Sequence, residues 1–187
     1  MRYLSPVSLF IAFIVLGALG PPSAMSQEGN HRSGFWMSGG IGGGFDESMR
    51  GGPGAYLSAG TTVSSHLLLG VRAFQFEGQP FAREGSKSRS NVTVGARAYP
   101  AAERNLFFRA GLGLATDQYQ ELIPGTTEVR WATEANVGAN LGVGRDIQLG
   151  DKNLYLTPSV DALLGFYEDG LDNPDATFLL TVGLGFR

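Results

Sequence analysis

Apolar and polar residues alternate along most of the chain with a period of two. The pattern is clearest in 177–187, where the even positions are large and apolar and the odd positions are mostly threonine, glycine or arginine. Side chains on a strand point to opposite faces in turn, so this pattern predicts strands with one apolar face and one polar or small face. No long segment shows the 3.6-residue apolar period of a helix.

The alternation recurs in eight segments, each at least nine residues long: 34–45, 53–64, 67–76, 91–99, 106–116, 129–143, 154–167 and 177–187. A tilted strand needs about 9–11 residues to cross a bilayer, whereas strands of soluble proteins average about 5–6. Two sets of connections alternate along the chain, 64–66, 100–105 and 144–153 in one set and 46–52, 78–90, 117–127 and 168–176 in the other. We therefore expect an all-β fold, an up-and-down antiparallel transmembrane β-barrel of about eight strands over residues 34–187.

Alternation does not say which face points outward, but the polar face does. A strand surface in water is normally covered with lysine, glutamate and aspartate. Here both lysines, Lys87 and Lys152, lie in predicted connections. The polar face is otherwise small and sparsely charged, which favours a narrow lumen inside and lipid outside. The alternative is a secreted, soluble lipocalin-like barrel with an apolar interior that binds a small apolar ligand.

The few mid-strand charges on the polar face are predicted to form a network inside the lumen. An ion in a narrow, low-dielectric space needs a partner. The surplus of arginine requires solvation by water or by backbone carbonyls. We interpret the network as a static plug, with a gated, narrow ion path as the alternative. Its predicted members are Arg72, Arg97, Arg109, Arg130, Glu134 and Asp161.

Aromatic residues on the apolar face cluster near the predicted strand ends. Such a distribution is typical of the two interfacial belts of a membrane barrel. The residues are Phe35, Phe45, Phe108, Trp131, Phe166, Phe178 and Phe186.

The N-terminus carries an apolar run over 7–19, which ends at Pro21 and Pro22. The run is too short for a membrane-spanning helix, and Ala24-Met25-Ser26 offers small residues at a cleavage site. Residues 1–26 are therefore predicted to be a signal peptide cut before Gln27, followed by a short N-terminal segment, 27–33. A retained N-terminal anchor is the alternative. The chain has no cysteine, which excludes disulfides.

The C-terminal stretch Thr181–Arg187 resembles the signal that the barrel assembly machinery reads, with Val182, Leu184 and Phe186 on the apolar face. That signal normally ends on an aromatic residue, whereas here Arg187 follows Phe186. With the eight-strand pattern, the chain resembles the small outer-membrane barrel family that includes the OmpA transmembrane domain and OmpX. The resemblance implies a bacterial outer-membrane protein exported through the periplasm. Its implied partners are periplasmic chaperones, the assembly machinery, outer-membrane lipid and lipopolysaccharide, and we expect a monomer.

Catalytic and metal-binding signals are weak. A further hypothesis is that the chain is a lipid A-modifying enzyme. The two histidines, His31 and His66, do not sit in a His-x-Ser setting, which opposes this hypothesis. The acidic loop 168–175 is compatible with weak calcium binding but is more typical of a solvated turn. Gly39–Gly44 lacks the lysine and the helix of a phosphate-binding loop.

A formal net charge of −3 argues against nucleic acid as a partner, and no cofactor is expected. The sequence thus predicts a non-enzymatic outer-membrane barrel with a structural role or loop-mediated surface interactions, and leaves a narrow channel open.

Overall fold

The computed structural model describes residues 34–47, 49, 51–78, 87–100, 105–122, 129–150, 153–166 and 175–187. The eight predicted strands are all confirmed, and a two-residue strand, β7, is additional. Among the described residues, no helix is long and apolar enough to cross a membrane. The strands are β1 (Gly34–Asp46), β2 (Gly51–Ser64), β3 (Leu67–Gly78), β4 (Lys87–Ala98), β5 (Leu106–Leu122), β6 (Val129–Arg145), β7 (Ile147–Gln148), β8 (Leu154–Phe166) and β9 (Asp175–Phe186).

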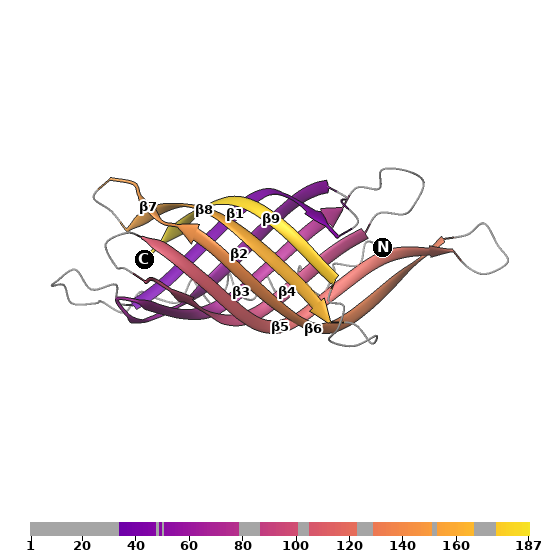
Figure 1. Ribbon diagram of the computed structural model, residues 1–187, viewed down its shortest axis with the longest axis horizontal. Coiled ribbons are helices and arrows are strands. Elements are labelled where there is room, and N and C mark those ends of the chain that lie inside the picture. Colours follow the sequence, from indigo (N-terminus) through magenta and orange to yellow (C-terminus); the bar gives the residue numbers. More distant parts are fainter. Residues whose placement is uncertain are drawn as a thin grey trace, which may run out of the picture. The chain divides into compact units, whose positions relative to one another are not determined.

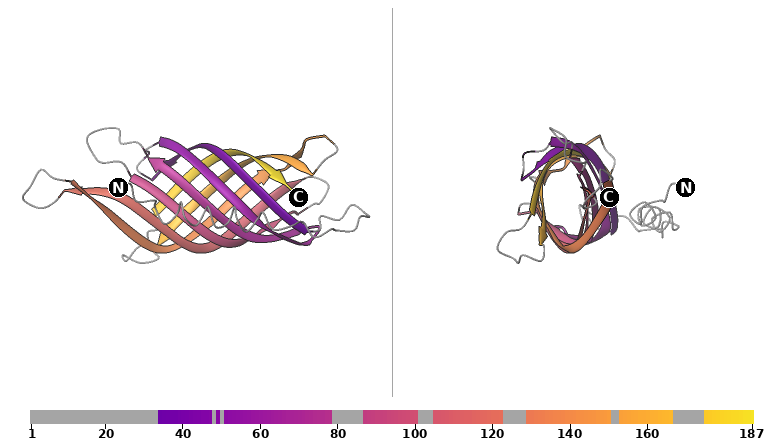
Figure 2. Two further views of the ribbon diagram at one scale, coloured as in Figure 1. Left: turned by 180° about the vertical axis from the view of Figure 1, so that it is seen from behind. Right: turned by 90° about the vertical axis from the view of Figure 1, so that its right-hand side faces the viewer.

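Each long strand pairs antiparallel with its neighbours in sequence, and the sheet closes on itself (Figures 1 and 2). β1 pairs with β9, and β6 pairs with β8. β7 continues the β6 side of the wall through two further pairs with β8. Closure leaves no free edge along the wall, so every strand finds its backbone partners there without water. The expected up-and-down barrel of eight strands is therefore confirmed.

The apolar face of the wall points outward. In the middle of the wall Ile41 is 76% exposed, Leu112 68% and Leu180 63%. Arg72, Thr181 and other residues of the polar face are buried in the lumen. A continuous apolar outer surface suits hydrocarbon and not water. The lipocalin-like alternative is therefore wrong, because it requires the opposite orientation of the faces.

Exposed phenylalanines stand near both ends of the outer wall. Phe35, Phe108 and Phe186 lie near one end, and Phe45 and Phe178 lie together near the other with ring centroids 5.5 Å apart. Of the other two residues of the predicted belts, Phe166 is half-buried and the side chain of Trp131 lies outside the described residues. The described positions match interfacial aromatic belts.

The two ends of the barrel differ. The turn end carries the Ser65–His66 turn and the C-terminus, and the loop end is the opposite one. At the loop end β5 and β6 extend beyond the wall (Figures 1 and 2). β6 pairs with β8 only from Val137 onward, so residues 129–136 pair with β5 alone.

Several predictions fall outside the described residues. They are the signal peptide 1–26, the segment 27–33, His31, and the greater part of the acidic loop 168–175. They remain predictions.

β1 leaves no room for a side chain beside β9 at a lumen-facing glycine, Gly42. A Cβ there would collide with the carbonyl oxygen of Leu180 and lie 2.7 Å from Cα of Thr181. At the next residue, Gly43, which faces outward, a Cβ would meet only the carbonyl oxygen of Gly52, at 3.6 Å. Gly42 is thus a position where the fold needs the absence of a side chain.

We predict that Gly42→Ala destabilises the barrel by about 1–3 kcal/mol, the usual cost of overpacking, because β1 and β9 must separate. Gly43→Ala is the matched control and is expected to be nearly neutral. Urea midpoints measured by gel mobility without boiling compare the two variants. Equal midpoints would show that the β1–β9 contact is not tight at Gly42.

Candidate functional site: the charged lumen

The lumen holds three clusters of buried arginine and aspartate, which follow one another along the barrel axis. The loop-end cluster centres on Arg89, the middle cluster on Asp161 and the turn-end cluster on Asp146. Each contains ion pairs between side chains that are far apart in sequence. Ion pairs taken out of water are stable only when their remaining polar atoms are also bonded, so the geometry of each cluster matters.

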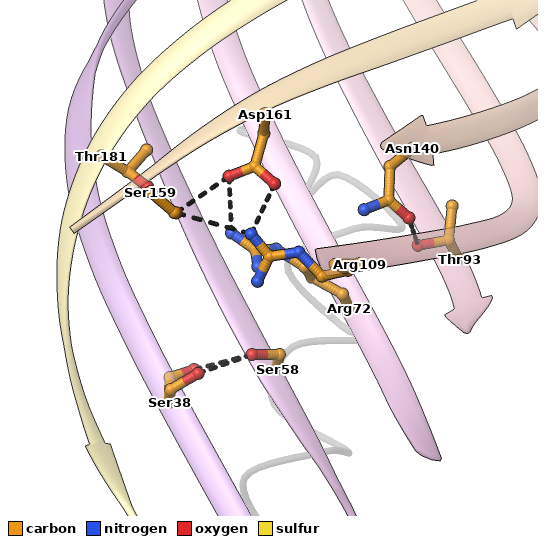
Figure 3. A network of polar contacts seen from close by, with 9 residues as sticks. All are labelled: Ser38, Ser58, Arg72, Thr93, Arg109, Asn140, Ser159, Asp161 and Thr181. Carbon is orange, nitrogen blue, oxygen red and sulfur yellow. Dashed lines mark hydrogen bonds and ion pairs between the residues drawn. The ribbon is translucent and has the colours of Figure 1, made fainter. Parts of the chain in front are cut away.

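The middle cluster joins opposite sides of the barrel (Figure 3). Asp161 on β8 is fully buried and pairs with Arg72 of β3 at 3.2 Å and with Arg109 of β5 at 2.5 Å. Ser159 donates to Asp161 at 3.1 Å and lies 3.0 Å from the hydroxyl of Thr181. One carboxylate thus ties β3, β5 and β8 together across the lumen.

The loop-end cluster is the most completely bonded. Arg89 on β4 donates to both carboxylate oxygens of Asp117 on β5, each at 2.7 Å. It also donates to the Asp175 carboxylate at 2.9 Å and to the Thr177 hydroxyl at 2.9 Å, both on β9. A bidentate arginine–carboxylate pair with further acceptors is a strong arrangement. It joins β4, β5 and β9 across the loop end of the lumen.

The turn-end cluster gathers around Asp146, which follows β6 and lies outside the long strands. Asp146 accepts hydrogen bonds from Tyr99 at 2.5 Å and Thr157 at 2.7 Å, and pairs with Arg187. Burial alone would raise the pKa of Asp146, but Arg97, Arg187 and the two hydroxyls outweigh it and lower that pKa. Burial raises the pKa of Tyr99 to about 12. At neutral pH the Asp146 carboxylate therefore accepts a hydrogen bond from the neutral phenol of Tyr99.

Aromatic rings cover the faces of the lumen arginines. The Arg72 guanidinium lies 3.8 Å from the ring centroid of Tyr56 and 4.1 Å from that of Phe74. Arg97 lies between Trp36 and Phe107, at 5.0 and 4.4 Å. These cation–π contacts replace part of the lost hydration of each cation.

The lumen is densely filled. Two cavities between the described residues of the lumen measure about 20 and about 10 Å³. A water molecule needs roughly 10–15 Å³ on this measure, whereas a pocket for a small-molecule ligand typically spans about 300–1,000 Å³. Neither cavity admits such a ligand.

Four of the six predicted network residues lie in these lumen clusters. Arg72, Arg109 and Asp161 meet in the middle cluster, and Arg97 lies 3.7 Å from Asp146. The role that the sequence suggested for them, a static plug, remains a prediction.

The placement of Arg130 and Glu134 in the lumen network is wrong. Both side chains are exposed, and Glu134 accepts a hydrogen bond from Tyr119 at 2.6 Å. The period of two is correct for them, but they belong to the part of β6 that precedes Val137 and pairs with β5 alone. Without β8 beside it, this part of β6 leaves both side chains exposed.

Sequence reasoning missed the other five charged members of the clusters: Arg89, Asp117, Asp146, Asp175 and Arg187. Four of them lie in segments assigned to connections, and Arg187 was interpreted only as a departure from the assembly signal. A usable signal existed for Arg89 and Asp117. Arg89 occupies an odd position, like Thr93 and Arg97 on the polar face of the same strand. Asp117 likewise occupies an odd position, like Arg109 on the polar face of its strand.

The outward positions of Val182, Leu184 and Phe186 agree with their alternation, and each is at least half exposed. Arg187 turns inward instead and bonds to Tyr99 and Asp146. An assembly role for the three apolar residues remains a prediction.

The only described histidine, His66, lies exposed in the β2–β3 turn, with Nδ1 2.9 Å from the Ser65 hydroxyl. No carboxylate bonds to His66 among the described residues. Across all the described residues, no group of three or more His, Cys, Asp or Glu side chains could hold a metal ion.

Several solved structures of outer-membrane proteins share this architecture. Neisserial surface protein A superposes with a TM-score of 0.60 at 11% identity, covering 86% of this chain and 99% of its own. The fold is that of the small eight-stranded outer-membrane β-barrels. Ail of Yersinia pestis, in complex with the heparin analogue sucrose octasulfate, gives a TM-score of 0.54 at 14% identity, covering 82% of this chain and 99% of its own.

OprG of Pseudomonas aeruginosa gives a TM-score of 0.50 at 10% identity, covering 84% of this chain and 98% of its own. No protein-family model matches the sequence, and no curated protein matches it either. The likeness to these outer-membrane barrels is therefore one of fold.

Proposed function

We propose that this chain is a monomeric, non-enzymatic protein of the bacterial outer membrane, with a sealed lumen and with its interactions made at the loop end. The barrel is the anchor in lipid and lipopolysaccharide, and the loops and the β5–β6 hairpin are the contact surface. The protein reaches the membrane through the periplasm, with chaperones and the barrel assembly machinery as its partners on the way. One observation carries the proposal, namely an apolar outer wall around a lumen filled by buried ion pairs.

The filled lumen argues against a passive channel. Ion pairs from three levels of the barrel cross it, and the cavities between them hold only one or two water molecules each. A small solute would have to break a buried pair to pass, which is costly. The function therefore lies outside the lumen.

The projecting hairpin supports a contact role for the loop end. Residues 119–122 and 129–132 pair with each other beyond the last β4–β5 and β6–β8 pairs, and the Tyr119–Glu134 hydrogen bond crosses the base of this ladder at an exposed position. A paired ribbon sets its side chains opposite one another at regular cross-strand spacing. We place this end outside the cell because the longer loops of outer-membrane barrels face outward.

Two experiments test the proposal. Cell fractionation should recover the protein in the outer membrane, with a fast-migrating form on gels that slows after boiling. Because the chain lacks cysteine, Thr133→Cys at the hairpin and His66→Cys at the turn end report topology with a membrane-impermeant maleimide. In intact cells, the maleimide is expected to label the Thr133→Cys variant and not the His66→Cys variant. Recovery in a soluble fraction, or labelling at the turn end only, would contradict the proposal.

We predict that the purified protein shows no single-channel current in planar lipid bilayers. The physical reason is that the Arg89 and Asp161 clusters close the lumen at two levels. A channel protein of known conductance, reconstituted in the same way, is the positive control. Discrete current steps from this protein would instead favour the narrow ion path.

A further inference from the structure

Three buried arginines border the larger of these two lumen cavities, which measures about 20 Å³. They are Arg72 on β3, Arg97 on β4 and Arg109 on β5, exposed by only 4, 4 and 7%. Arg97 and Arg109 are direct cross-strand partners. Like charges that face each other across two strands repel, so this level of the barrel is electrostatically unfavourable as it stands.

These arginines carry more hydrogen-bond donors than the surrounding residues have acceptors for. Among the described residues no hydrogen-bond partner exists for six of their nitrogen atoms, Nε and Nη1 of Arg72, Nε and Nη2 of Arg97, and Nε and Nη1 of Arg109. Aromatic rings cover the faces of the guanidinium groups, but the N–H bonds lie in the guanidinium plane and still need acceptors. Arg89 shows the contrast, since its Nε, Nη1 and Nη2 all donate.

Asn140 adds a seventh donor to the same cavity. Its Oδ1 accepts a hydrogen bond from the Thr93 hydroxyl at 2.8 Å, which directs Nδ2 to the other side (Figure 3). Nδ2 has no partner among the described residues, although Asn140 is only 1% exposed. The cavity is therefore bordered by residues with spare donors from four strands, β3, β4, β5 and β6.

The carboxylates nearby do not balance the charge. Asp161 bonds to both Arg72 and Arg109. Asp146 is 3.7 Å from Arg97 and also pairs with Arg187. Four cations thus share two anions in the middle and turn-end clusters, and a net positive charge away from water is costly.

We propose that the cavity binds one small monovalent anion, for which chloride is the natural candidate. The spare donors of Arg72, Arg97, Arg109 and Asn140 would hold it. The volume exceeds the roughly 10–15 Å³ that one water needs, so a monatomic ion fits, while a polyatomic ligand of ordinary size does not. The proposal rests on the closed barrel alone and is independent of the proposed contact role.

Bromide is the probe for occupancy. Crystals of the full-length protein, purified and refolded in sodium bromide, should show an anomalous scattering peak between Arg97 and Arg109. Refolding in bromide is needed because the lumen is closed to exchange. Water at this position with no anomalous signal would overturn the proposal.

A second measurement follows the stability of the barrel. At constant ionic strength, replacing gluconate with chloride or bromide during refolding should raise the gel-shift melting midpoint in a saturable way. Asn140→Asp places a fixed carboxylate at the cavity and is expected to abolish this shift while the barrel remains folded. Arg89→Gln, remote from the cavity, is expected to lower the midpoint and keep the shift.

A halide shift that survives in Asn140→Asp, or is absent from the unsubstituted protein, would contradict the site. If Asn140→Asp does not fold, the bromide peak in the unsubstituted protein decides the question. Loss of surface labelling or detection of current would affect the proposed function only, so the two proposals fail separately.

Discussion

Asp161→Asn is expected to destabilise the barrel by about 3–5 kcal/mol, the cost of removing one partner from a buried ion pair. The variant keeps the shape of the side chain but removes the charge that neutralises Arg72 and Arg109. Both arginines then remain buried without a counter-charge, at 3.2 and 2.5 Å from the substituted group. Equilibrium unfolding in urea, in phospholipid vesicles, measures the loss. Trp36, buried at the turn end, provides a fluorescence signal from the lumen.

Asp175→Asn is the matched control. Its side chain is 25% exposed and it also pairs with a lumen arginine, but Arg89 keeps both oxygens of Asp117 after the change. We expect a loss of about 1 kcal/mol or less, typical of a partly solvated pair. Adding Arg72→Met to Asp161→Asn should recover part of the stability, because one uncompensated cation is removed. Similar losses for the two aspartates would contradict the central role of Asp161.

The second large effect concerns the outer wall. Val182→Arg should cost about 2–4 kcal/mol, the depth-dependent penalty for arginine on the lipid face near the bilayer midplane. Val182 lies in the middle part of β9, paired with Ile41 and Pro158, and is half exposed to the surroundings of the barrel. Insertion into vesicles and the urea midpoint of the inserted form measure the effect.

Two further variants separate the lipid face from an assembly signal. Leu112→Arg on β5 is equally lipid-facing but lies far from the C-terminus, so it should lower stability in vesicles by a similar amount. Only Val182→Arg is expected to show an extra loss of assembly in cells. Thr133→Arg on the projecting hairpin is the tolerated control, with an expected cost of about 0–1 kcal/mol. Equal tolerance at Thr133 and Leu112 would contradict the assignment of the outer wall to lipid.

The sequence alone predicted which residues of each strand face the same side, because the alternation of side chains is a local property. A strand turns its side chains to alternate faces whatever its neighbours are, so Phe178 and Leu180 were separable from Thr177 and Thr181 without any tertiary information. The near absence of strand lysine then indicated which face met water. For the same reason the strand ends were less well defined. Arg89 and Asp117 continue the alternation, but they stand beside residues typical of loops.

The partners of the lumen charges were not predictable. Arg72 and Asp161 are 89 residues apart, and their contact depends on how the closed sheet is staggered, which no local pattern encodes. Arg130 and Glu134 illustrate the same limit, since only the pairing of β6 with β8 from Val137 onward determines which part of β6 is covered on both sides.

The sequence by itself therefore determined the strands, the two faces and the membrane barrel. The tertiary structure alone decided which charges meet. It set three arginines around one small cavity, because closure of the barrel brings β3, β4, β5 and β8 around a single narrow axis.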